Sequence, residues 1–261
     1  MTTTDITMRR AIKWNSAAQT NTGCVREVNE DAIFLKPEIG VWAVADGMGG
    51  YEAGDIASNM IVELLDDIED KVSLSDIVDN MEDKFIEANT NILEYADVMR
   101  DKQMMGSTVV GLIIRGRVGV CLWVGDSRLY RYRNGELQQL SQDHSQVQEL
   151  IQQGFLSEED AVNHPEANVI TRAIGAGDDV YVDINVFSTQ IGDTFLLCSD
   201  GLHNSVSTAE IINCLNDTDI NESVSNMLKK ALENKAADNV SMIIARGEVD
   251  KVSNNKTVLT Q

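Results

Sequence analysis

Residues 41–50, VWAVADGMGG, constrain the fold more than any other stretch of the chain. Residues 41–45 form a short apolar run, which is typical of a buried β-strand. Asp46 ends the run, and the three glycines among the next four residues predict a tight turn of bare backbone. A carboxylate beside accessible backbone carbonyls suits a hard divalent cation, which binds carboxylate, carbonyl and water oxygens. An ordinary β-turn with aspartate as turn former explains this stretch, taken alone, equally well.

Four apolar runs of the chain have an acidic residue at one end. These are residues 41–45 before Asp46, residues 118–124 before Gly125 and Asp126, residues 194–199 before Asp200, and residues 240–245 after Asp238. Antiparallel pairing brings the start of one strand beside the end of its neighbour, so we expect all four acids to meet at one sheet edge. Gathered carboxylates raise one another's pKa values, and one or two divalent cations would remove that cost. Oxygen-only ligands favour Mg²⁺ or Mn²⁺ over zinc. Separate turn aspartates are the weaker explanation.

The rest of the chain predicts a mixed α and β domain without repeats or an interdomain linker. Further strands are predicted at residues 13–22, 32–35, 107–114, 118–124, 128–133, 136–140, 180–187, 194–198 and 240–245, and helices at residues 53–68, 75–99, 146–153, 208–215 and 222–233. We expect the four strands between residues 107 and 140 to form one antiparallel meander. We therefore predict a single domain at residues 1–247 and a polar tail at residues 248–261.

The charge and cysteine patterns limit the function classes. The 261 residues carry a net charge of −21, which argues against binding to nucleic acid or to anionic membranes. Four scattered cysteines without a CxxC pair argue against disulfides and zinc. The N-terminus lacks the apolar core of a signal peptide, and no apolar run reaches membrane length. We expect a cytoplasmic protein.

Six motifs along the chain resemble those of a known family. In chain order they are RxxxED at residues 26–31, DGMGG at 46–50, GDSR at 125–128, TRAIG at 171–175, SDGL at 199–202 and DN at 238–239. The same motifs occur in this order in metal-dependent protein phosphatases of the PP2C type (the PPM family), and the resemblance covers roughly Trp14 to Ala245. It implies an α+β fold in which two antiparallel sheets pack face to face between helices, a four-layer αββα sandwich.

The resemblance also implies two core metal ions, Mn²⁺ or Mg²⁺, and oxygen ligands for them. The ligands would be Asp46 as the bridge with the carbonyl of Gly47, Asp200 and Asp238 on one ion, and Glu30 on the other, with Asp31 reaching a bound water. Two such ions lower the pKa of a bridging water and hold a phosphoryl group for in-line displacement, so no covalent phosphoenzyme is needed.

Further roles follow from the same resemblance. Arg26 would bind the substrate phosphate as a planar fork. Asp126 matches a residue that helps hold a third, weaker metal ion in bacterial members. Arg128 would brace the GDSR turn, and residues 151–168 correspond to the variable flap beside the active site.

The sequence departs from the family pattern at two positions. Met48 follows the DG dipeptide where animal members often have a histidine that protonates the leaving group, so we assign no general acid. Asn204 stands where the family often has an aspartate, and a neutral ligand there should weaken the third metal site. We interpret His203 as a loop residue and His144 as a structural one.

These features predict a protein serine/threonine phosphatase of the bacterial stand-alone type. It would be a monomer acting on phosphoprotein substrates of a separate Ser/Thr kinase. The patterns GDIAS at residues 54–58 and MGSTVVGL at 105–112 resemble phosphatases paired with kinases that control type VI secretion. A catalytically silent binding module on the same fold is one alternative, although all four core acids are present. Hydrolysis of small phosphoesters is the other.

Overall fold

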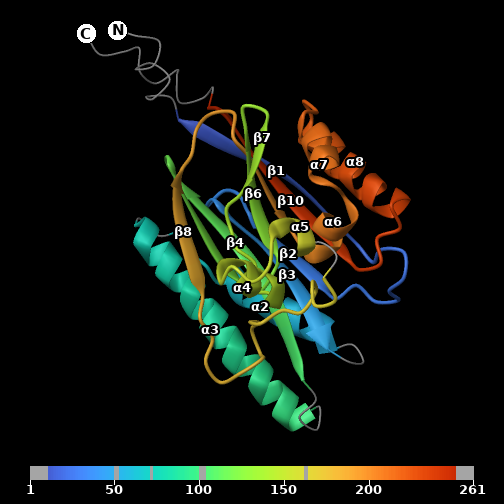
Figure 1. The fold of residues 1–261 in the computed structure, drawn as a ribbon. Helices are drawn as coiled ribbons and strands as arrows, with labels where there is room; N and C mark the ends of the chain where they lie inside the picture. Colours follow the sequence, from blue (N-terminus) through green and yellow to red (C-terminus); the bar gives the residue numbers. More distant parts are fainter. Residues whose placement is uncertain (1–10, 50–52, 71–72, 100–103, 162–163, 251–261) are drawn as a thin grey trace, which may run out of the picture.

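The computed structural model describes residues 11–49, 53–70, 73–99, 104–161 and 164–250. Within them, two five-stranded antiparallel sheets pack against each other, and helices cover both outer faces (Figure 1). This is the αββα sandwich that the resemblance implies. Gly50, residues 1–10 and residues 251–261 of the predicted tail lie outside the described residues. None of the helices in the described ranges combines the length and apolar character that a membrane crossing needs.

Each sheet joins strands from distant parts of the sequence. The first sheet has the order β1 (Ile12–Asn21), β10 (Val240–Val249), β9 (Thr194–Cys198), β6 (Arg128–Arg133) and β7 (Glu136–Gln139). The second has the order β2 (Asp31–Lys36), β3 (Val41–Gly49), β4 (Met105–Arg115), β5 (Val118–Val124) and β8 (Asp183–Ser188). All pairings between neighbours are antiparallel.

The central strands are buried on both faces, which is why their sequences are continuous apolar runs. In β3, Ala43 points to the helices on the outer face, whereas Trp42 and Val44 point to the other sheet. Phe195 and Leu197 of β9 meet them in the layer between the sheets. Successive side chains of a strand alternate between faces, so a strand sandwiched in this way has no polar face to present.

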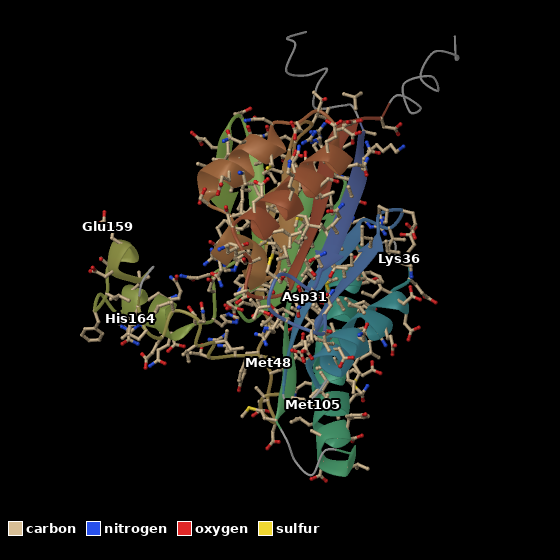
Figure 2. All side chains as sticks on the ribbon, turned by 90° about the vertical axis from the view of Figure 1, so that its right-hand side faces the viewer. Asp31, Lys36, Met48, Met105, Glu159 and His164 are labelled. Carbon is tan, nitrogen blue, oxygen red and sulfur yellow. The ribbon has the colours of Figure 1, made fainter. Side chains whose placement is uncertain are left out.

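The helices divide between the two outer faces. Helices α2 (Ala53–Asp66) and α3 (Leu74–Met99) cover the second sheet, and α6 (Asp200–Ser205), α7 (Thr208–Leu215) and α8 (Ile220–Glu233) cover the first (Figure 1). Two short helices, α4 (Gln146–Gln152) and α5 (Glu158–Ala161), belong to the segment that bears Glu159 and His164. That segment projects from the body of the sandwich (Figure 2).

The predicted meander of residues 107–140 is wrong. Its first two strands, β4 and β5, pair in the second sheet, whereas β6 and β7 pair in the first. The chain crosses between the sheets at Gly125, Asp126 and Ser127. The physical reason is burial: β4 and β5 are apolar on both faces and must lie inside the sandwich, and the GDS sequence supplies the break that lets the chain leave their sheet.

The predicted tight turn after Asp46 is also wrong. Strand β3 continues through Gly49 and stays paired with β4 as far as Met105. Gly47 serves close packing instead of a turn, because a Cβ on it would lie 2.0 Å from the backbone oxygen of Gly54.

Candidate metal centre

The predicted ligand acids gather at one end of the sandwich. Asp31 and Asp46 are direct partners in the β2–β3 register. Asp200 opens α6 directly after β9, and Asp238 lies just before β10, which pairs antiparallel with β9. The acids therefore come from both sheets, and the expectation of one shared sheet edge is wrong. Packing two sheets face to face brings their ends together, which strand pairing within one sheet could not reveal.

The carboxyl groups at this end oppose one another's ionisation. Burial raises the pKa of Asp31 to about 6, and the nearby charges of Asp200 and Asp238 add to the rise. The pKa of Asp200 is also raised to about 6, by burial and then by Asp238. Burial, followed by repulsion from Asp31 and Asp200, holds the pKa of Asp46 well above its usual range. A divalent cation among these groups would offset the repulsion.

Asp31 has a buried oxygen that fits such a cation. Its Oδ2 accepts a hydrogen bond of 2.8 Å from the hydroxyl of Ser199, whereas its Oδ1 has no hydrogen-bond partner among the described residues. Buried polar atoms are rarely left unpaired in folded proteins. A water bound to a metal ion would supply the missing donor, so the chemistry of this donor set fits Mg²⁺ or Mn²⁺.

Glu30 is held by backbone amides of helix α2 and strand β3. The amide of Gly54 donates to Glu30 Oε1 at 3.1 Å, and the amide of Gly47 donates to the Glu30 carbonyl at 3.0 Å. A Cβ on Gly54 would lie 2.5 Å from Glu30 Oε1. The first turn of α2 therefore fixes the Glu30 carboxylate beside strand β3, and only glycine fits there.

Arg26 is paired with a predicted metal ligand. Its Nη2 lies 2.7 Å from Oδ2 of Asp238, and both side chains are partly exposed. This bond raises the pKa of Arg26. Within the described residues, no group of three or more acidic, histidine or cysteine side chains converges closely enough to hold a metal ion as the side chains stand. The site thus has the acids in one place, with Asp238 engaged by the arginine.

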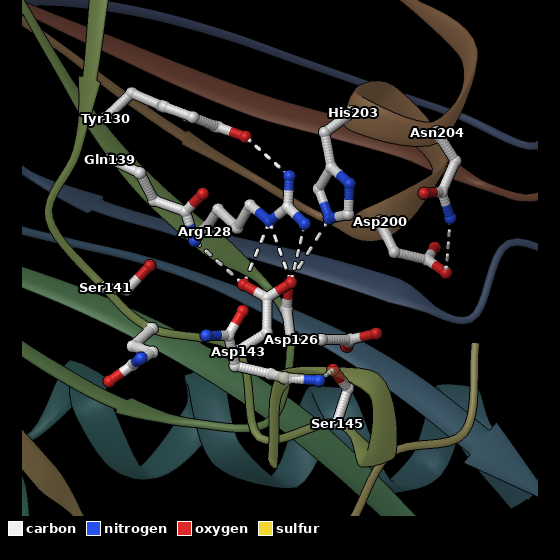
Figure 3. Close-up of polar contacts among 12 residues, drawn as sticks. Asp126, Arg128, Tyr130, Gln139, Ser141, Asp143, Ser145, Asp200, His203 and Asn204 are labelled. Atoms are coloured by element: carbon white, nitrogen blue, oxygen red, sulfur yellow. Dashed lines mark hydrogen bonds and ion pairs between the residues drawn. The ribbon is translucent and has the colours of Figure 1, made fainter. Parts of the chain in front are cut away.

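The residues predicted for a third metal lie beside Asp200, one of the core acids (Figure 3). Asp126 is buried, and burial and the charge of Asp200 raise its pKa to about 7. Asn204 directs its amide nitrogen to Asp200 Oδ2 at 3.2 Å. His203 Nε2 lies 3.3 Å from the backbone oxygen of Asp126 and so faces the backbone of the turn.

Two residues hold the ligand loops in place through contacts that sequence reasoning did not predict. Asn239 accepts a 2.8 Å hydrogen bond from the amide of Glu30 and donates to the carbonyls of Thr22 and Val28. Ser199 accepts from the amide of Ser241 and donates to Asp31. Both residues belong to the motifs DN and SDGL, so the motifs located them, but only the fold shows what they contact.

Comparison with known proteins agrees with this site. The sequence profile of the family described as Protein phosphatase 2C matches residues 25–242. The serine/threonine phosphatase stp of Listeria innocua is 38% identical over 234 residues, which cover 87% of this chain and 93% of that protein. The serine/threonine protein phosphatase PstP of Mycobacterium tuberculosis is 33% identical over 230 residues. The aligned residues cover 88% of this chain and 44% of that protein.

Solved structures show the same architecture. PppA, described as a key regulatory component of T6SS in Pseudomonas aeruginosa, has a TM-score of 0.84 and 38% identity, covering 92% of this chain and all of that one. A crystal structure of M. tuberculosis PstP has a TM-score of 0.85 at 31% identity, covering 91% of this chain and 99% of that one. The catalytic domain of PstP in complex with two manganese ions has a TM-score of 0.82 at 30% identity, with the same coverage.

Proposed function

The chain belongs to the Protein phosphatase 2C family and is a protein serine/threonine phosphatase, and we propose that the acids at the end of its sandwich hold the metal ions on which this activity depends. The two manganese ions bound by PstP support Mn²⁺ or Mg²⁺ as the cofactor. Residues 1–247 would act as one domain, because residues of both sheets share the core layer between them.

We assign metal binding to the acids and phosphate binding to Arg26. Asp46, Asp200, Asp238 and Glu30 would hold the two core ions, with the carbonyl of Gly47 and, through water, Asp31 completing the set. When bound, the ions supply charge neutralisation and a more acidic water. Arg26 stands at the exposed side of the acids, where its guanidinium can bind a phosphate with two parallel hydrogen bonds.

The observation that carries this proposal is the mutual crowding of the acids. After burial, the largest causes that raise the pKa of Asp46 are the negative charges of Asp31, Asp200, Asp126 and Asp238. A cluster of this kind costs folding free energy and is kept where it serves binding or catalysis. The raised pKa values and the unpaired oxygen of Asp31 both support a site for cations.

The test is hydrolysis of a phosphothreonine peptide by purified protein with added Mn²⁺ or Mg²⁺, with EDTA, and without addition. Activity should depend on the added metal and be lost with EDTA. Asp66→Asn, at an exposed end of α2, removes the same charge far from the acids and should keep wild-type activity. Full turnover in metal-stripped protein would overturn the metal-dependent assignment.

We further propose that the enzyme is a cytoplasmic, signalling monomer that opposes a separate Ser/Thr kinase. The likeness to PppA supports a substrate phosphorylated in the control of type VI secretion. Phosphoproteomics of cells with and without the active enzyme would name that substrate. Turnover of p-nitrophenyl phosphate without turnover of any phosphopeptide would favour the small-phosphoester alternative, and loss of both activities would favour a silent module.

We also propose that Asp126 contributes to a third, weaker metal site. Asn204 lies next to Asp200 and brings no charge to it. Asn204→Asp should therefore lower the Mn²⁺ concentration that gives half-maximal activity, because added ligand charge tightens the binding of hard cations. Identical activation curves for the wild type and this variant would place Asn204 outside the site.

A further inference from the structure

Asp126 lies in the short segment, residues 125–127, that connects β5 of the second sheet with β6 of the first. Gly125 has a φ of +110° and packs its Cα against Thr108 of β4, where a Cβ would lie 2.5 Å from the threonine side chain. Ser127 Oγ and Thr108 Oγ1 lie 2.7 Å apart. These contacts place the backbone of the turn on β4 but do not bind the segment on its other side.

Asp143 binds one side of this turn. The guanidinium of Arg128 donates from Nε to both carboxylate oxygens of Asp143, at 2.9 and 3.0 Å, and from Nη2 at 2.6 Å (Figure 3). Nη1 of Arg128 also donates to the hydroxyl of Tyr130 at 2.9 Å. A bidentate pair of this kind fixes direction as well as distance. Arg128 braces the GDSR turn, as the resemblance implies, and Asp143 is the residue against which it does so.

His144 binds the other side. Its backbone amide donates to the carbonyl of Gly125 at 2.9 Å, and its Nδ1 accepts from the amide of Gly125 at 3.0 Å. Since Nδ1 is the acceptor, the ring carries its proton on Nε2, which lies 3.4 Å from Oδ2 of Asp183. The ring is buried and stacks on Trp123, with centroids 6.1 Å apart. Burial lowers the pKa of His144, which keeps this neutral form.

The same residue connects the turn to the segment that follows the projecting helices. The carbonyl of His144 accepts from the amide of Thr171, the first residue of the TRAIG motif. Arg172 of that motif pairs with Asp183 at 3.1 Å, so the carboxylate beside the His144 ring is itself held. His144 thus joins the Asp126 turn to the base of the flap.

We propose that Asp143 and His144 are positioning residues that hold Asp126 in the orientation needed for the weaker metal ion. This inference rests on the proposed function of Asp126. It assigns a specific role to a dipeptide that neither the sequence motifs nor the comparisons explain. The effect is transmitted through Gly125, which precedes Asp126, and through Arg128, two residues after it, and needs no contact between His144 and the metal.

The test compares two replacements of His144 that differ in one feature. In His144→Asn, the side-chain oxygen lies one bond from Cγ, as Nδ1 does, so it can still accept from the Gly125 amide. In His144→Gln, the amide lies one bond further out and cannot accept at that position. Calorimetric titration of metal-free protein with Mn²⁺ should show a loss of about 10-fold or more in weak-site affinity for His144→Gln. The core sites should be unchanged, and His144→Asn should stay close to the wild type.

Two further measurements separate positioning from general stability. Hydrogen exchange of the Gly125 amide should be slow in the wild type and in His144→Asn, and faster in His144→Gln. Asp143→Asn, which weakens the pair with Arg128, should lower weak-site affinity as well. If affinity falls only in variants that have begun to unfold at the assay temperature, the positioning role is wrong.

Asp126→Ala separates failure of the positioning role from failure of the proposed third metal site. If Asp126→Ala removes the weak binding event and His144→Gln leaves it intact, the positioning inference is wrong while the proposed site stands. If Asp126→Ala has no effect, or the wild type shows no weak event, the proposed third site is wrong and the inference falls with it.

Discussion

The two ends of strand β9 carry aspartates with opposite surroundings. Asp193, just before the strand, is 1% exposed and is bound by Arg133, whose Nε and Nη2 lie 2.6 and 2.7 Å from its two oxygens. The amide of Gln190 donates to it as well, at 2.7 Å. Asp200, just after the strand, has its pKa raised to about 6 by burial and by Asp238. At the start of β9, the charge of Asp193 is neutralised by Arg133. At its end, the charge of Asp200 lies near further negative charges.

This difference separates structure from function on a single strand. A buried carboxylate with a bidentate arginine is satisfied by the protein alone. A carboxylate that lies among other carboxylates has its negative charge offset chiefly by protons or by cations from solution. We expect changes at Asp193 to lower stability without altering metal binding, and changes among the core acids to weaken metal binding without lowering the stability of the metal-free protein.

The largest expected effect is loss of activity in Asp46→Asn. The charges of Asp31, Asp200 and Asp238 all act on this residue, and it would serve as a ligand of the core ions. Turnover of a phosphothreonine peptide should fall at least about 100-fold. The fold should persist or gain stability, because one repelling charge is removed. The measurements are steady-state kinetics at saturating Mn²⁺ and thermal unfolding in EDTA. Near-normal turnover would remove Asp46 from the site.

The next effect is on the pH dependence of stability. The folded pKa values of Asp31 and Asp200 are about 6, above the ordinary 3.8, and that of Asp126 is about 7. The folded protein therefore binds more protons than the unfolded chain between these values. In EDTA, the free energy of unfolding should fall as pH rises from 5 to 8. Saturating Mn²⁺ should flatten this decline, which thermal unfolding at a series of pH values would measure. A metal-free curve that rises over this range would contradict the raised pKa values.

A smaller effect is expected at the other end of β9. Asp193→Asn leaves the guanidinium of Arg133 with a weaker, neutral partner. The free energy of unfolding should fall by about 1–3 kcal/mol, as measured in urea. Activity per folded molecule and Mn²⁺ affinity should not change. A loss of metal affinity in this variant would contradict the purely structural role assigned to Asp193.

The smallest effect concerns Arg26→Ala. The pair between Arg26 and Asp238 is partly exposed, and its removal frees a predicted metal ligand. Core-site Mn²⁺ affinity should rise by less than about fivefold, as befits an exposed ion pair. The KM for phosphopeptide should rise because the phosphate loses its guanidinium. Titration calorimetry and steady-state kinetics measure the two effects separately. Weaker metal binding in this variant would give Arg26 a structural role instead.

The resemblance in motif order was sufficient for the layers, and the apolar runs that border on acids located most of the candidate ligands, because both signals are local patterns of the sequence. The wrong predictions concerned contacts between residues that lie far apart in the sequence. The turn expected after Asp46 is strand, because the need for glycine came from the approach of Gly54, a contact that no periodicity records. The meander failed at Gly125 because pairing rules do not say when a chain changes sheets. The roles of Asn239 and His144 depend on backbone atoms far away in the sequence.

The most direct test of the account is thermal unfolding of the wild type and Asp46→Asn near neutral pH, with EDTA and with Mn²⁺. At a Mn²⁺ concentration 100 times the Kd, binding should raise the wild-type Tm by roughly 5–10 °C, whereas Asp46→Asn should show almost no rise. In EDTA, Asp46→Asn should melt at or above the wild-type temperature. An equal rise in both proteins, or none in the wild type, would show that these acids do not gather to bind metal.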